Sequence, residues 1–112
     1  MNQLELQTRR NNIRRLFRHQ SGIHVNCVRI NSGNTYEHER AKFEECWKLA
    51  KLGKEFLTEA ETPDKSKRAD IVCLDEGYII EIVNTESEES LIRKSKVYPL
   101  PIVIVRVKGD VA

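Results

Sequence analysis

The stretch Arg68-Ala-Asp-Ile-Val-Cys-Leu-Asp-Glu-Gly-Tyr-Ile-Ile-Glu-Ile-Val83 decides the fold of this chain. It contains two runs rich in β-branched residues, 69–74 and 78–83, and the residues between them include Glu76-Gly77. Glycine takes a positive φ at no steric cost, so a glycine in this place is typical of a tight turn. The stretch therefore predicts a β-hairpin.

Two acids, Asp70 and Glu81, interrupt the apolar strands of this hairpin. A loop at Glu76-Gly77 places Asp70 opposite Val83, whereas a loop one residue earlier places Asp70 opposite Glu81. Side chains alternate with period two, so both registers put the two carboxylates on one face; a three-residue loop would separate them. Two carboxylates that close need a positive partner, and a divalent cation such as Mg²⁺ or Mn²⁺ is the simplest one.

Length and composition indicate one folded domain over residues 1–112. The formal net charge is only +2, but residues 1–20 hold five arginines against one glutamate, a local excess that fits a phosphate-rich ligand. Three widely spaced cysteines suggest neither a zinc site nor a disulfide framework. The sequence has no signal peptide and no bilayer-spanning apolar run, which predicts a cytoplasmic protein without membrane association.

An N-terminal extension, residues 1–34, is expected to precede the core. Its residues 3–19 have helical character, with Arg10, Arg14 and Arg18 recurring every four residues along one face. Arginine presents a planar donor fork that suits phosphate. This face is either solvated or a phosphate-contacting edge. Apolar residues alternate with other residues over 23–30, which predicts a strand.

A helix over 35–52 is the clearest element of the core, with Asn34 as a candidate cap and Gly53 just past the end. Glu39 lies one turn before its apolar stripe, either as a functional acid or as a helix-dipole glutamate. The neighbouring His38 reads as a surface histidine at the helix start. The stripe expected to face the core comprises Phe43, Cys46, Trp47 and Ala50.

Further elements follow on both sides of the hairpin. Residues 54–61 predict a strand that enters it, with Glu59 as a second candidate acid. A capping box at Thr85-Glu-Ser-Glu88 predicts a helix to about Lys96. The continuous apolar run 102–107 predicts a strand covered on both faces of the sheet.

The order of these elements and three short motifs resemble the PD-(D/E)XK nuclease-like superfamily over residues 35–107. The motifs are His38-Glu-Arg-Ala-Lys42, Arg68-Ala-Asp70 and Ile80-Glu-Ile-Val83. The resemblance implies an α/β restriction-endonuclease-like core, a central mixed sheet flanked by helices in αβββαβ order. It also implies catalytic roles for Glu39, Asp70 and Glu81, with Asp70 and Glu81 binding Mg²⁺ or Mn²⁺.

The chain departs from the family motif at two positions. Val83 stands where the motif has lysine, and Ala69 stands where it has proline. Some members of the superfamily carry the lysine on another element, commonly the following helix. Lys94 or Lys96 would then take that role here, with Lys42 of the first core helix as a further candidate.

The first functional hypothesis is a metal-dependent nuclease that hydrolyses phosphodiester bonds, of DNA rather than RNA. Nucleic-acid contacts would come from Arg10, Arg14, Arg18 and Lys42, and family analogy implies a homodimer. A second hypothesis, favoured by Val83, is a catalytically inactive nuclease-like module for nucleic-acid binding or assembly. A third is a structural subunit whose buried acids pair with Lys42 or His38.

Overall fold

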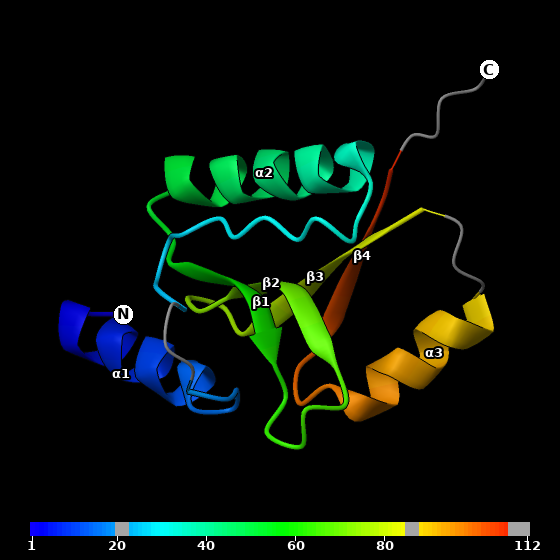
Figure 1. Ribbon diagram of the computed structural model, residues 1–112. Coiled ribbons are helices and arrows are strands. Elements are labelled where there is room, and N and C mark those ends of the chain that lie inside the picture. Colours follow the sequence, from blue (N-terminus) through cyan, green and yellow to red (C-terminus); the bar gives the residue numbers. More distant parts are fainter. Residues whose placement is uncertain (20–22, 85–87, 108–112) are drawn as a thin grey trace.

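The computed structural model describes residues 1–19, 23–84 and 88–107, and the predicted α/β class is confirmed. A four-stranded mixed sheet has helices on both sides (Figure 1). No helix in these ranges combines the length and the apolarity needed to cross a bilayer. In chain order the elements are α1 (Gln3–Arg14), α2 (Tyr36–Lys51), β1 (Phe56–Glu61), β2 (Arg68–Cys73), β3 (Tyr78–Val83), α3 (Glu88–Val97) and β4 (Ile102–Arg106).

The sheet has the strand order β1-β2-β3-β4. The first three strands run antiparallel, and β4 lies parallel to β3 after the α3 crossover. The predicted hairpin is confirmed, with Cys73 opposite Tyr78 and Ile71 opposite Ile80. This is the register expected for the earlier loop. Gly77 has φ +73°, and its N–H donates to Cys73 O at 3.0 Å, which closes the turn.

Each face of the sheet has its own apolar cluster, and α2 covers one face while α1 and α3 lie on the other (Figure 1). The α2 side is built from Cys46, Leu49, Phe56, Ile71, Cys73, Ile80 and Ile82. The opposite side is built from Phe17, Ile23, Leu57, Ala60, Ala69, Val72, Leu74, Ile79 and Tyr98. Burial of Cys46 also raises the pKa of its thiol to about 12, so this cysteine acts as a small apolar side chain.

The N-terminal extension differs from the prediction in two ways. Helix α1 ends at Arg14 rather than near residue 19, and residues 23–30 do not form a strand. Asn26 has φ +58°, which interrupts an extended backbone. The segment still lies against β1, because Asn26 N–H donates to Phe56 O and Phe56 N–H donates to Asn26 Oδ1. Thr58 Oγ1 adds a bond to Cys27 O.

Helix α2 has nearly the predicted bounds, but it buries a different stripe. Phe43 and Trp47 are 52% and 57% exposed, whereas the buried residues are Lys42, Cys46 and Leu49. The helix is therefore rotated by about one residue from the expected orientation, so the prediction for Phe43, Trp47 and Ala50 was wrong. Its cap is Thr35, whose hydroxyl accepts from His38 N–H, rather than Asn34. The predicted glycine past its end is confirmed, since Gly53 has φ +72°.

The C-terminal elements agree with the prediction in type. Helix α3 was expected to start from a capping box, but residues 85–87 of that box lie outside the described residues. Strand β4 is present, yet it is the last strand of the sheet and exposes Val103 (46%) and Ile104 (36%). The expectation that both faces of this strand are covered was therefore wrong, because consecutive side chains point to opposite faces and both of these are partly exposed.

Candidate functional site

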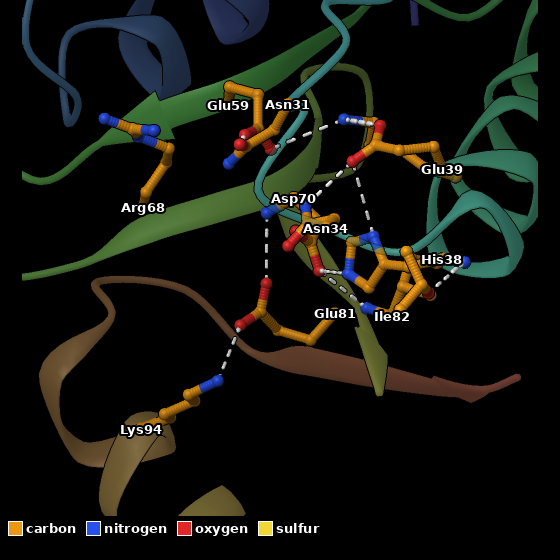
Figure 2. A network of polar contacts seen from close by, with 12 residues as sticks. Asn31, Asn34, His38, Glu39, Glu59, Arg68, Asp70, Glu81, Ile82 and Lys94 are labelled. Atoms are coloured by element: carbon orange, nitrogen blue, oxygen red, sulfur yellow. Dashed lines mark hydrogen bonds and ion pairs between the residues drawn. The ribbon is translucent and has the colours of Figure 1, made fainter. Parts of the chain in front are cut away.

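The candidate site lies where strands β2 and β3 cease to pair. Their ladder ends at Ile71 and Ile80, and the same register sets Asp70 opposite Glu81. Beyond that point the side chains of the two acids accept hydrogen bonds from the backbone of the opposite strand (Figure 2). Asp70 N–H donates to Glu81 Oε2 at 3.0 Å, and Ile82 N–H donates to Asp70 Oδ2 at 2.8 Å. The two acids are close, as predicted, through reciprocal side-chain-to-backbone hydrogen bonds. They do not share one face as expected, because Asp70 contacts α2 and Glu81 contacts α3 on the opposite side of the sheet (Figure 1).

Asp70 lies next to the first turn of α2. His38 Nε2 is 3.4 Å from Asp70 Oδ2, and His38 Nδ1 is 3.6 Å from Glu39 Oε1. The hydrogen bond to Asp70 raises the pKa of His38, despite the opposing effect of burial. His38 therefore lies between two carboxylates and links the helix to the hairpin. It is a cation when protonated, so it offsets the charge of Asp70.

Glu81 lies on the side of the sheet that carries α3. Its side chain is 4% exposed, with Lys94 Nζ 3.6 Å and Tyr98 Oη 3.2 Å from Oε1. Burial, followed by repulsion from Asp70, raises the pKa of Glu81 to about 7. Tyr98 Oη is also 3.0 Å from Arg68 O, and a hydroxyl has one proton to donate. A protonated Glu81 satisfies both contacts, because it donates to Tyr98 while Tyr98 donates to Arg68 O.

Glu39 belongs to a buried network next to this pair. Its Oε2 is 2.5 Å from Lys42 Nζ, and its Oε1 accepts from Asn34 Nδ2 at 2.7 Å. Lys42 is fully buried and also lies 3.6 Å from Glu59 Oε2. Burial acts to raise the pKa of Glu39, but the bonds from Lys42 and Asn34 outweigh it and lower that pKa. Glu39 is thus ionised and reaches Asp70 through His38 rather than directly.

The lysines and arginines predicted to act at the site occupy different environments. Lys94 contacts Glu81, whereas Lys96 is exposed in the last turn of α3. Arg10 donates to both carboxylate oxygens of Asp75, at 2.8 and 3.0 Å. This contact lowers the pKa of Asp75 and secures α1 against the hairpin turn.

Arg10 therefore serves the fold, and so does Lys42, because a fully buried ammonium does not reach a ligand at the surface. Arg14 and Arg18 are partly exposed and line a hollow near the end of α1. Val83 is 2% exposed, so the position that the resemblance assigns to lysine is an apolar core position.

A hollow of about 330 Å³ opens beside Asp70. Its lining combines the carboxylates of Glu59 and Glu61 with the basic side chains of Lys67 and Arg68. Glu59 is 6% exposed and has φ +53°, an unusual conformation for a residue with a side chain. The hollow gives a ligand access to one side of the site.

The potential metal ligands at this site are carboxylates and the imidazole of His38. In the described ranges, no three His, Cys, Asp or Glu side chains converge as a metal-binding group. Asp70 and Glu81 are the adjacent acids, with Asp70 Oδ2 and both oxygens of Glu81 already in protein contacts. Mg²⁺ is commonly held by one or two carboxylates with several retained waters. The donor set therefore fits a hydrated Mg²⁺ or Mn²⁺ rather than a fully protein-ligated ion.

Sequence reasoning missed the roles of two residues at this site. His38 was expected at the surface and was paired with a buried acid only in the third hypothesis, although its spacing from Glu39 and Lys42 on one helix turn could have indicated a shared cluster. Tyr98 had no signal at all, because its contact with Glu81 spans 17 positions and depends on the path of the chain after α3.

Comparison of the chain with protein-family models, with curated proteins and with solved structures found no match.

Proposed function

We propose that this protein is a metal-dependent nuclease that hydrolyses phosphodiester bonds in the cytoplasm, with DNA as the preferred nucleic acid. The observation that carries the proposal is the end of the β2–β3 ladder, where Asp70 and Glu81 exchange hydrogen bonds with the opposite backbone. Apolar side chains at these positions could not accept hydrogen bonds from those two backbone N–H groups. Two acids instead are costly in a hairpin core, and a bound cation would offset that cost.

The arrangement of elements supports a restriction-endonuclease-like core as part of the proposal. From α2 onward the order is αβββαβ, with three antiparallel strands followed by a parallel one. The acids proposed to act, Glu39, Asp70 and Glu81, come from the first helix and the central hairpin of this arrangement.

Asp70 and Glu81 would hold Mg²⁺ or Mn²⁺. When bound, the ion supplies polarisation of the scissile phosphate and activation of a water molecule. Glu81 binds a cation in its ionised form, so a pKa of about 7 predicts that binding releases a proton near neutral pH. Glu39 is a positioning residue, since it orients His38 and thereby Asp70.

Lys94 is the lysine proposed to assist the reaction in place of Val83. Its ammonium lies beside Glu81, where it would stabilise negative charge that develops on the phosphate. Lys96 is two residues further along the helix and exposed, which makes Lys94→Gln and Lys96→Gln a matched pair of variants.

The test is cleavage of labelled single-stranded and duplex DNA, and of RNA, with Mg²⁺, Mn²⁺ or EDTA. Asp70→Asn and Glu81→Gln should abolish metal-dependent cleavage, and Lys94→Gln should reduce it roughly 100-fold, in the range known for loss of one charge-stabilising donor. Lys96→Gln and the exposed Glu44→Gln serve as controls that retain activity. Cleavage unchanged by Asp70→Asn and Glu81→Gln would refute the proposal.

A second candidate function is a catalytically inactive nuclease-like module that binds nucleic acid or assembles with a partner. Val83 favours it, because this position is 2% exposed and the ammonium group of a lysine there would be buried away from water at a high cost in free energy. Calorimetric titration with Mg²⁺ separates the two, since the nuclease should bind the ion and Glu81→Gln should not. Sedimentation analysis tests the homodimer that the family analogy implies.

A further inference from the structure

Three hollows have basic residues in their lining, one at the C-terminal end of α1 and two beside strands β1 and β2. The first, about 370 Å³, lies at the end of α1, and Arg14, Arg15 and Arg18 are among its lining residues. Its floor includes the buried rings and methyl groups of Phe17 and Leu57. The arginines therefore share the lining of this hollow with buried apolar side chains of the core.

Glu61, at the end of β1, lines both other hollows and contacts Arg18 of the first. Its Oε2 is 3.0 Å from Arg18 Nη1 and its Oε1 is 3.2 Å from Arg68 Nη2. The backbone N–H of Arg18 also donates to Glu61 O at 2.9 Å. Glu61 is 15% exposed, but Arg18 and Arg68 are 30% and 51% exposed. One carboxylate therefore fixes two guanidinium groups whose other N–H donors remain accessible to a ligand.

The second and third hollows, about 330 and 380 Å³, share Glu61 and Arg68, and the second reaches Asp70. Arg68 lies on the strand that leads to Asp70 (Figure 2). Lys65 and Lys67 line the second hollow from the β1–β2 turn.

This turn is held by Asp64, which accepts from Ser66 N–H and from Thr62 Oγ1. These bonds lower the pKa of Asp64 to about 2, so they persist at neutral pH. The two lysines are therefore presented on a defined turn.

Basic side chains dominate the combined lining. Seven lysines and arginines meet three carboxylates there, whereas the whole chain has 19 against 17. Two of the carboxylates are matched, Glu61 by its arginines and Glu59 by Lys42 and Asn31. The seven residues, here called the basic track, are Arg14, Arg15, Arg18, Arg29, Lys65, Lys67 and Arg68.

We propose that the basic track binds the phosphates of several consecutive nucleotides, and that the strand runs from the end of α1 across the β1–β2 turn to Asp70. The direction toward Asp70 rests on the proposed nuclease function; the binding itself does not. Arginine forks and lysines contact phosphate without reading bases, so binding is independent of sequence and strongly dependent on salt. The track keeps Arg14 and Arg18 of the contacts predicted from helical spacing and leaves out Arg10, which pairs with Asp75.

Fluorescence anisotropy with a labelled 12-nucleotide DNA strand in EDTA measures this binding without cleavage. The double variants Arg14→Gln/Arg15→Gln and Lys65→Gln/Lys67→Gln each remove two phosphate contacts. A plot of the logarithm of the binding constant against the logarithm of salt concentration has a negative slope. Each double variant should make that slope shallower by about 1.4, at about 0.7 per phosphate on a single strand. The control Lys48→Gln/Lys51→Gln removes the same charge from exposed positions of α2 and should leave the slope unchanged.

Equal slope losses in the control and the track variants would overturn the proposal, as would unchanged slopes in both track variants. A dinucleotide that binds as tightly as the 12-nucleotide strand would also overturn it. The nuclease proposal fails separately: slopes as expected without any metal-dependent cleavage would leave the basic track in place and refute catalysis. Metal-dependent cleavage with unchanged slopes would support the nuclease proposal and refute the basic track.

Discussion

At the scale of single residues, the protonation of Glu81 connects stability with function. The side chain is buried among Asp70, Lys94 and Tyr98, and its pKa is raised to about 7 from an ordinary value of 4.5. The folded protein therefore holds a proton on Glu81 more tightly than the unfolded chain does. The same group must lose that proton to bind a cation in the proposed site.

This arrangement predicts that stability falls as pH rises from about 5 to 8. Because the folded pKa of Glu81 is raised, its stabilising contribution is complete below about 4.5 and is lost as pH rises through about 7. The change amounts to roughly 3 kcal/mol at about 1.4 kcal/mol per pKa unit. Urea denaturation of wild type and Glu81→Gln at several pH values measures it.

The variant should lose most of this dependence and keep a smaller one of the same sign, because the pKa of His38 is also raised. Glu44→Gln, on the exposed face of α2, should behave as wild type does. A Glu81→Gln variant with the full wild-type pH dependence would contradict the assignment of the effect to Glu81.

At the scale of elements, α2 shows why an apolar pattern does not define the buried face. This helix has two apolar stripes, either of which could face the sheet. One runs through Phe43 and Trp47, and the other runs through Cys46 and Leu49. The aromatic stripe has the larger side chains, but it lies outward, with the two rings 6.3 Å apart and Lys51 over Trp47 at 5.8 Å. With the inner stripe buried, Lys42 lies close to Glu59 of β1 and His38 lies close to Asp70 of β2.

The orientation of α2 predicts a large effect for one substitution of a large side chain and a small effect for another. Leu49→Ala should cost roughly 2–5 kcal/mol of the free energy of unfolding, because it leaves a cavity among buried side chains. Trp47→Gln should change it by about 0.5 kcal/mol or less, since the ring is largely solvated. Thermal and urea unfolding of both variants test this. Similar large losses in both would mean that the aromatic stripe is buried.

At the scale of the whole molecule, one buried ammonium ties together segments that are distant in sequence. Lys42 of α2 lies close to Glu39 in its own helix and to Glu59 of β1, and it donates to Arg29 O at 2.7 Å. The irregular segment before α2 is thereby fixed over the hollow beside Asp70. The site depends on this connection, because Asn31 and Asn34 of that segment hold Glu59 and Glu39.

We therefore expect Lys42→Met to lower the free energy of unfolding by roughly 3–5 kcal/mol. The methionine keeps the apolar stem, but two buried carboxylates lose their counter-ion. Urea denaturation gives the value, and Lys48→Met, whose side chain is 68% exposed, provides the control with a change within about 0.5 kcal/mol. A small loss in Lys42→Met would indicate that water or another group replaces the ammonium.

The sequence by itself determined the hairpin, its neighbouring strand, the bounds of α2 and the α/β class, because alternation and glycine turns act over a few residues. It also identified Asp70 and Glu81 as the acids out of place. Only the tertiary structure decided which face α2 buries and whether residues 23–30 form a strand. It also decided which acids the lysine and arginine side chains contact. Lys42 and Arg10 serve the fold while Lys94 contacts Glu81, since the partner of a charged side chain depends on contacts between residues 3 to 65 positions apart.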